Sequence, residues 1–156
     1  MLNRLCDRVT SVVHLAMWTA FAALIATVAL QVIARNILHA PMIWTGDLAQ
    51  LLFAWLIFVG AAAGLRTGAH YDVDLLPTDR PAVAIAVEAI SLAAGACVAW
   101  MLVRYGWELA QVRATAQVQS LGISRFWMFL PMPVSGALMA LYLVEMLADF
   151  AARRPS

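Results

Sequence analysis

The sequence predicts an all-α integral membrane protein with four transmembrane helices. Of its 156 residues, 64% are hydrophobic and only 12% are charged, and the mean hydropathy is +0.84. A soluble domain is about half apolar and about a quarter charged, so a surface of this composition is unsuited to water. Four long apolar segments lack the period-two alternation of barrel strands, and each approaches the roughly twenty residues that a helix needs to cross a bilayer.

The predicted spans cover roughly residues 9–34, 48–66, 82–104 and 126–147, and we expect residues 1–156 to form a single four-helix membrane domain. The first apolar run is much longer than the roughly 7–15 residues of a signal-peptide core, so we interpret it as an uncleaved span. An even number of spans places both termini on the same side of the membrane.

The distribution of arginine favours a cytoplasmic position for both termini. In that orientation the inner segments carry Arg4, Arg8, Arg66, Arg80, Arg153 and Arg154, and the outer segments carry Arg35, Arg104, Arg113 and Arg125. Because cytoplasmic segments beside membrane spans are enriched in basic residues, the small inner excess indicates this orientation.

The first two spans meet through a short connection with polar and aromatic residues at its edges. Arg35 ends the first span and is interpreted as an interfacial anchor. Trp44 suits the membrane interface at the start of the second span. We expect Thr45 or Asp47 to cap the first turn of that span, where a side-chain oxygen can accept from free backbone N–H groups and a carboxylate complements the helix dipole.

The second span carries a face of small residues. Gly60, Gly64 and Gly68 recur at every fourth position and therefore lie on one side of a helix. Small side chains at this spacing let membrane helices approach closely. The face predicts a helix contact either within this subunit or with a partner protein, and both possibilities remain open.

The longest connection lies between the third and fourth spans, in residues 104–125. Only Gly106 interrupts its good helix formers up to about Gln119. We therefore expect either a polar helical extension of the third span or a helix lying at the membrane interface. Pro131 and Pro133 are expected to kink or tilt the outer end of the fourth span, because proline cannot donate a backbone hydrogen bond.

Glu88 is a carboxylate within the third predicted span. Ionisable groups inside the membrane often mark functional sites, and small four-helix exporters use such a glutamate to exchange protons for cations. Glu88 lies close to the inner end of its span. A structural role is therefore favoured, in which the side chain reaches the interface or pairs with Arg80 or Arg66.

Several classes of protein have no support in the sequence. A net charge of +1 gives no electrostatic basis for binding nucleic acid. Neither a nucleotide-binding glycine motif nor a nucleophile with a partner base is present, so no enzymatic activity is expected. His14 lies in a span while His39 and His70 fall in loops on opposite sides. We therefore expect no haem, no metal site and no other cofactor.

The stretch GLRTGAHYDVDLLP concentrates charge directly after the second span. Arg66, His70 and Asp74 are four residues apart and would share one side of a continuing helix. Asp72 and Asp79 could pair with them. Two interpretations remain open: a solvated helix terminus, where basic groups complement the dipole, or a cluster that docks on a partner subunit or on lipid headgroups.

The order of these features resembles the small membrane subunit, DctQ type, of tripartite ATP-independent periplasmic (TRAP) transporters. Trp44 and Asp47 open the second span, FVGAAAGLR follows from Phe58, and His70 and Asp74 come next. The preceding VIARNIL is similar to the family's arginine-containing end of the first span. LGISRFWMFLPMPVSGALM is similar to the family's entry into the fourth span, so the resemblance covers nearly the whole chain.

The resemblance implies a scaffold subunit of a secondary-active, ion-gradient-driven uptake system for an organic-acid solute, in the bacterial inner membrane. It implies two partners, a large many-span subunit of the DctM type and a periplasmic solute-binding protein of the DctP type. Because the chain ends at Ser156, we expect the large subunit to be a separate protein. The alternatives are a self-sufficient proton-coupled exporter and the small subunit of a tripartite tricarboxylate transporter. Candidate contacts with a partner or lipid are Arg35, Trp44, Asp47, Gly60, Gly64, Arg66, Gly68, His70 and Asp74.

Overall fold

A computed structural model describes residues 2–40, 42–66 and 81–153, and it confirms the prediction of an all-α protein with four membrane-crossing helices. The elements are α1 (Leu2–Asn36), α2 (Ile43–Arg66), α3 (Pro81–Val112), α4 (Phe126–Phe129) and α5 (Pro131–Arg153), with two short strands between α3 and α4. Each helix is apolar and long enough to cross a bilayer, with α4 and α5 together forming the fourth span. The spans are helical because, in lipid, each backbone N–H and C=O must find its partner inside the segment.

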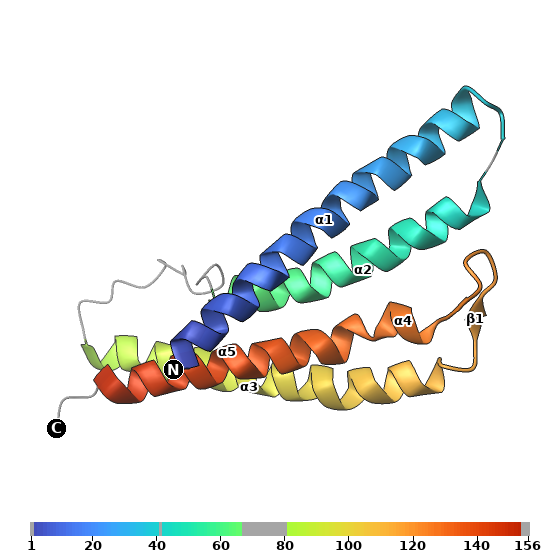
Figure 1. Cartoon of the computed structure of the whole chain (residues 1–156). Coiled ribbons are helices and arrows are strands. Elements are labelled where there is room, and N and C mark those ends of the chain that lie inside the picture. The colour runs from blue at the N-terminus through green and yellow to red at the C-terminus, as the bar shows by residue number, and fades with distance from the viewer. Residues whose placement is uncertain (1, 41, 67–80, 154–156) are drawn as a thin grey trace.

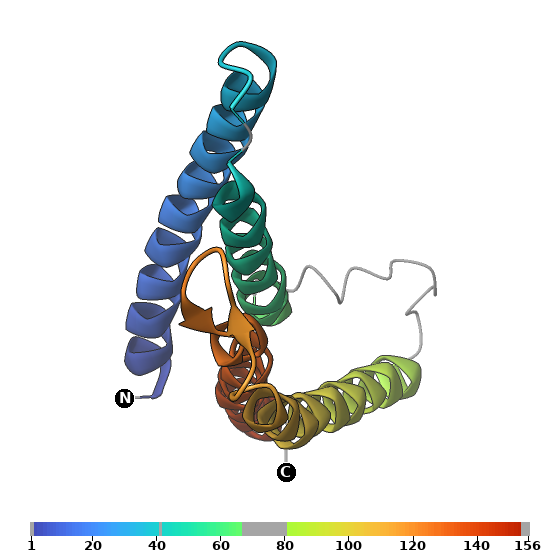
Figure 2. The same ribbon diagram turned by 90° about the vertical axis from the view of Figure 1, so that its right-hand side faces the viewer.

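The start of α1 and the end of α5 lie at one end of the molecule, and the α1–α2 and α3–α4 connections lie at the other (Figure 1). We call the first the terminal end and the second the hairpin end, after the β-hairpin that joins α3 to α4. The spatial order of the helices is α1, α2, α5, α3, because α1 packs on α2, α2 on α5, and α5 on α3. Seen from the hairpin end, α3 points away from the α1–α2 pair (Figure 2), so the helices form an open, angled layer.

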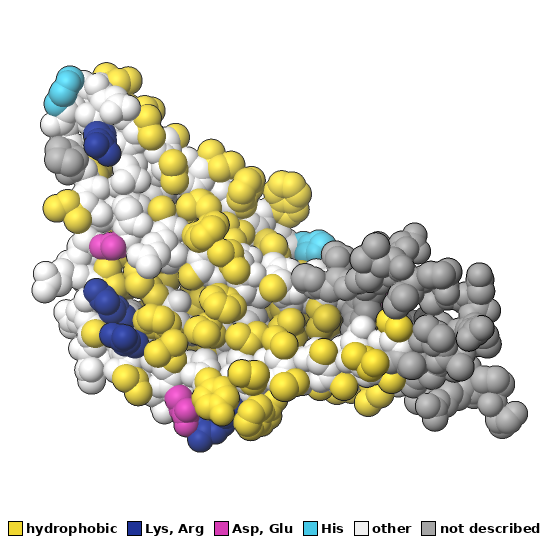
Figure 3. Space-filling model, turned by 180° about the vertical axis from the view of Figure 1, so that it is seen from behind, with side chains coloured by type: hydrophobic (Ala, Val, Ile, Leu, Met, Phe, Trp, Pro, Cys, Tyr) yellow, Lys and Arg dark blue, Asp and Glu magenta, His cyan; other side chains and the backbone are white. Residues whose placement is uncertain are grey.

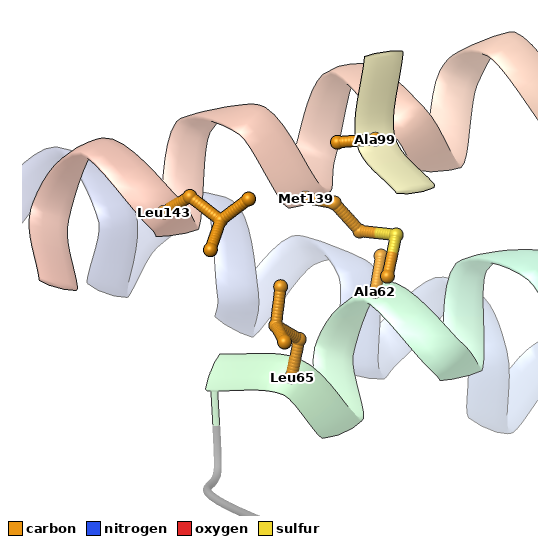
Figure 4. Packing of buried hydrophobic residues seen from close by; sticks show 5 residues of the cluster. All are labelled: Ala62, Leu65, Ala99, Met139 and Leu143. Carbon is orange, nitrogen blue, oxygen red and sulfur yellow. The ribbon is translucent and has the colours of Figure 1, made fainter. Parts of the chain in front are cut away.

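The fourth span occupies the centre of this layer. Of its most apolar window, 39% is buried, compared with 11% for the windows of the first and third spans. The main core cluster joins three helices: Ala62 and Leu65 come from α2, Ala99 from α3, and Met139 and Leu143 from α5 (Figure 4). Two of these residues, Ala62 and Ala99, are small, and small residues let membrane helices approach closely.

The closest packing involves two glycines on α3 and α5. A Cβ atom at Gly136 would lie 2.9 Å from the Ala99 carbonyl oxygen, and one at Gly106 would lie 2.8 Å from the Met132 Cβ. These contacts leave no room for a side chain. The sequence prediction had identified only the glycines of the second span, and the structure adds this second set of close contacts.

On α2, the glycine face is described only in part. A Cβ at Gly60 would lie 3.1 Å from the Met17 Cε on α1, so this position packs within the subunit. Gly64 is half-buried, and Gly68 lies outside the described residues. At Gly60, therefore, the small residue serves an internal contact.

The predicted helix up to about Gln119 is wrong in its last part. The polar extension of α3 does exist, but it ends at Val112. A two-stranded antiparallel hairpin follows, in which β1 (Gln117–Val118) pairs with β2 (Ile123–Ser124). Two features override the local helix propensity of this stretch. Gly122 has φ +65, a left-handed conformation that suits the turn. Val118 is buried, with only 5% of its surface exposed.

The predicted cap at the start of α2 is also wrong. The helix begins at Ile43, so Thr45 and Asp47 already lie inside it. The Thr45 hydroxyl donates to the Met42 carbonyl oxygen at 2.6 Å, and among the described residues it accepts no hydrogen bond from a first-turn N–H group. The Asp47 carboxylate accepts a hydrogen bond from the Ser120 hydroxyl in the hairpin. Asp47 therefore ties the start of α2 to the α3–α4 connection.

The two prolines divide the fourth span as expected, with α4 ending at Phe129 and α5 beginning at Pro131. Pro131 has no N–H group, so it cannot donate to the Trp127 carbonyl oxygen, its usual helical partner. The Trp55 indole Nε1 of α2 donates to that oxygen at 3.2 Å instead. A backbone acceptor freed by proline thus becomes a link between the second and fourth spans.

Candidate functional site

The Arg66 side chain, at the last residue of α2, turns into the subunit at the terminal end. Only 18% of the side chain is exposed. Its Nε donates to the Glu145 Oε2 at 2.9 Å, and its Nη2 donates to the Glu145 Oε1 at 3.0 Å. The same Nη2 donates to the Asp7 Oδ1 at 2.7 Å. This fork geometry matches a guanidinium to a carboxylate with two parallel hydrogen bonds.

Two further residues complete the surroundings of the guanidinium. Arg66 Nη1 donates to the Thr10 Oγ1 at 2.7 Å, and that hydroxyl donates in turn to the Tyr142 hydroxyl at 3.0 Å. The Tyr142 ring centroid lies 5.6 Å from the Arg66 Cζ, within range of a cation–π contact. We call Asp7, Thr10, Arg66, Tyr142 and Glu145 the arginine cluster.

Helical spacing explains why these side chains converge. Asp7 and Thr10 are three apart on α1, and Tyr142 and Glu145 are three apart on α5, so each pair shares one helix face. Arg66 reaches both faces from α2. Three of the four spans are therefore joined by one guanidinium.

The pairing with Arg66 explains how a carboxylate can be buried in this cluster. Glu145 is 7% exposed, so its carboxylate has little access to water. A buried carboxylate is costly unless it is paired and hydrogen-bonded. Arg66 satisfies both oxygens of Glu145, and the more exposed Asp7 adds a second carboxylate partner at the water-facing side of the guanidinium. The cluster is thus suited to holding helices together.

Sequence reasoning identified Arg66 but missed the four residues that bind it. Glu145 carried the same signal that drew attention to Glu88, a carboxylate within an apolar segment. The expected pairing of Glu88 with Arg66 is wrong, because Arg66 pairs with Glu145 and Asp7, and Glu88 is exposed. Arg80, the other expected partner, lies outside the described residues.

Three of the described candidate residues, Arg35, Trp44 and Asp47, lie away from the arginine cluster. Arg35 lies in the last turn of α1, where it complements the helix dipole, and Trp44 is 38% exposed. Both belong to the hairpin end, as does Asp47. His70 and Asp74 lie outside the described residues, so their predicted alignment with Arg66 has no structural description.

Exposed apolar side chains cover much of the described surface. Figure 3 shows hydrophobic side chains across the middle of one face, with most of the coloured charges in the half that carries the hairpin. Within residues 2–40, 42–66 and 81–153, no three His, Cys, Asp or Glu side chains could hold a metal ion together. With four apolar helices and polar groups engaged in helix contacts, the molecule is a multi-pass membrane protein.

Comparison with known families places this protein among transporter subunits. The family described as "Tripartite ATP-independent periplasmic transporters, DctQ component" matches residues 24–153. The chain belongs to this family and is therefore a TRAP transporter subunit. The match covers the later part of α1 and the other three spans.

Individual relatives agree with this assignment. The chain is 27% identical over 146 residues to the sialic acid TRAP transporter small permease protein SiaQ of Vibrio cholerae, covering 93% of this chain and 83% of that protein. It is 27% identical over 114 residues to the C4-dicarboxylate TRAP transporter small permease protein DctQ of Rhodobacter capsulatus. That match covers 70% of this chain and 50% of the Rhodobacter protein. It is also 26% identical over 130 residues to the sialic acid TRAP transporter permease protein SiaT of Haemophilus influenzae, covering 81% of this chain but 21% of that much longer protein.

Proposed function

We propose that this chain is the scaffold subunit of an ion-gradient-driven TRAP uptake system for an organic acid. In this role it braces a large transport subunit in the bacterial inner membrane, with both of its own termini in the cytoplasm. The observation that carries the proposal is the joining of three spans by Arg66, Glu145 and Asp7 within an open helical layer. A brace must hold its shape while leaving a broad surface for its partner.

Further polar links support a stiff layer. At the hairpin end, Ser120 bonds to Asp47, and midway along the layer Trp55 bonds to the Trp127 carbonyl. Together with the arginine cluster, these contacts connect the second span to the fourth span and to the hairpin that precedes it. Hydrogen bonds between helices in the membrane add to van der Waals packing and fix relative position.

The partner surface that we favour lies on α3 and α5. A groove of about 640 Å³ runs between them, and its lining combines several alanines with larger apolar residues such as Trp100 and Leu147. Small residues allow another helix to approach closely, and a large aromatic side chain can anchor it. We propose that a helix of a large subunit of the DctM type occupies this groove. Arg35, Trp44, Gly64, Gly68, His70 and Asp74 remain candidate contacts with that subunit or with lipid.

The longer relative supports a large partner. The match covers only 21% of the Haemophilus permease protein, so in that protein the region similar to this chain is one part of a much longer polypeptide. The small permease relatives also support a large partner, and we propose that this chain works together with one. Capture of the solute is assigned to a periplasmic binding protein of the DctP type.

The names of the relatives support a proposal for the class of solute. Sialic acid and C4-dicarboxylates are both organic acids that carry carboxylates. We propose a carboxylate-bearing solute for this system as well. The choice among such acids is assigned to the binding protein and the large subunit.

Reconstitution tests the proposal. The chain should support uptake in liposomes only together with its large subunit, a solute-loaded binding protein and an ion gradient. The chain alone should transport nothing. Transport by the isolated chain that is abolished in Glu88→Gln would reject the scaffold function and favour the exporter.

A further inference from the structure

A second polar site lies at the hairpin end, remote from the arginine cluster. A pocket of about 400 Å³ is enclosed by the start of α2, the hairpin and α4. Its polar wall includes Asp47, Gln50 and Gln119, together with Arg125. The pocket thus collects one carboxylate, one guanidinium and amide groups at the edge of the membrane spans.

Helical spacing places these groups around one opening. Ile43, Asp47 and Gln50 follow the i, i+4, i+7 pattern along one face of α2. Arg125 directly precedes α4, whose Met128 and Phe129 line the same pocket. One side of the pocket is therefore polar, and the other continues into apolar residues of two spans.

The charged groups keep capacity for a ligand. Asp47 accepts the Ser120 hydroxyl at Oδ2, and within the described chain Oδ1 has no hydrogen-bond partner. Arg125 is exposed, and among the described residues its side chain forms no ion pair or hydrogen bond. Asp47 and Arg125 line one pocket without pairing to each other. The pocket therefore offers separate positions for an anionic and a cationic group of a ligand.

We propose that this pocket binds a phospholipid headgroup that carries both a phosphate and a primary ammonium, as in phosphatidylethanolamine. The phosphate pairs with Arg125, because a guanidinium matches phosphate oxygens through two N–H groups. The ammonium donates to the free oxygen of Asp47, and the amides of Gln50 and Gln119 supply further donors and acceptors. Ile43, Met128 and Phe129 face the acyl chains.

The headgroup chemistry distinguishes this ligand from other lipids. A glycerol headgroup has no cation for Asp47, and a choline headgroup has no N–H to donate. The inference depends on the membrane location of the chain and is independent of the scaffold function, since lipid binding can be measured without transport.

Lipid binding to the full-length chain, purified in detergent, tests the site by native mass spectrometry. Phosphatidylethanolamine should bind about tenfold or more tightly than phosphatidylglycerol with the same acyl chains, as expected when one charge-assisted hydrogen bond is lost. Soluble glycerophosphoethanolamine should bind far more weakly than the lipid, because it lacks the acyl chains. Equal affinity for the two lipids would overturn the proposal. If soluble glycerophosphoethanolamine bound as tightly as phosphatidylethanolamine, the pocket would be a site for a free phosphate compound and the lipid proposal would be rejected.

Paired variants locate the binding. Arg125→Gln should weaken both lipids about tenfold or more, whereas Arg113→Gln, which removes the same charge nearby and outside the pocket lining, should weaken neither. Asp47→Asn should remove the preference for ethanolamine while leaving phosphatidylglycerol unchanged. Ser120→Ala removes the hairpin hydrogen bond but keeps the carboxylate, so it should retain the preference. Equal losses in Arg113→Gln and Arg125→Gln, or a retained preference in Asp47→Asn, would refute the assignment.

Discussion

Arg66 and Glu145 form a two-pronged ion pair that joins the last residue of α2 to the second half of α5, with the Nε and Oε2 atoms 2.9 Å apart. The two residues are 79 positions apart in the sequence. Their pairing is the contact on which the scaffold proposal depends most directly.

Removal of Arg66 should destabilise the folded chain strongly. In Arg66→Ala the Glu145 carboxylate stays buried without its cation, a change that costs about 3–5 kcal/mol in comparable cases. Arg104→Ala is the control, because its ion pair with Glu108 is exposed on both sides and should cost about 0.5 kcal/mol or less. Thermal unfolding in detergent measures both variants.

The double variant Arg66→Leu/Glu145→Leu should lose much less stability than the sum of the two single variants, since it leaves no unpaired charge. Additive losses would show that the two residues act separately. The amount of large subunit that co-purifies with each of these variants measures whether the arginine cluster is also needed for assembly of the complex.

Gly136 should tolerate no side chain. In Gly136→Ala the new methyl group would lie 2.9 Å from the Ala99 carbonyl oxygen, so α3 and α5 must separate at a cost of about 1–3 kcal/mol. Gly46→Ala is a matched helical control, because its nearest neighbour would be the Gln31 side-chain nitrogen at 3.9 Å. That control should be neutral or stabilising by up to about 1 kcal/mol, and a comparable loss in both variants would contradict the packing argument.

Gly122 should be required for its backbone conformation. Its φ is +65, and a Cβ at this position would meet nothing within 4 Å. Gly122→Ala should therefore cost about 1–2 kcal/mol through strain, and Gly122→Asn should cost less, because asparagine adopts this conformation more readily. Thermal unfolding of the two variants distinguishes backbone strain from steric conflict. A larger loss of stability in Gly122→Asn than in Gly122→Ala would indicate steric conflict and contradict the prediction.

Trp55 should matter because of Pro131. Trp55→Phe removes the indole donor and leaves the Trp127 carbonyl oxygen without that partner, at a cost of about 1 kcal/mol. Pro131→Ala restores a backbone N–H that can bond to the same oxygen. The loss caused by Trp55→Phe should therefore shrink in the Pro131→Ala background, and an unchanged loss would assign the effect of Trp55 to packing alone.

The sequence by itself determined the class of fold and the family. Apolar segments of membrane-spanning length have few options, because lipid offers no partner for backbone polar groups, and helix formation satisfies them locally. The break at Pro131 was predictable for a similar reason, since the missing N–H is a property of one residue. Trp44, Asp47 and the order of the later motifs were sufficient to recognise the DctQ type.

Tertiary structure alone decided which polar groups meet. Asp7, Arg66 and Glu145 belong to three different helices, and only the packing order α1, α2, α5 brings them together. Gly106 and Gly136 became identifiable as close contacts only after α3 and α5 were paired. The hairpin formed where local propensity favoured helix, because burial of Val118 and the left-handed turn at Gly122 outweighed that propensity. Such contacts depend on residues far apart in the chain, so they follow from the arrangement of the helices and cannot be read from any one segment.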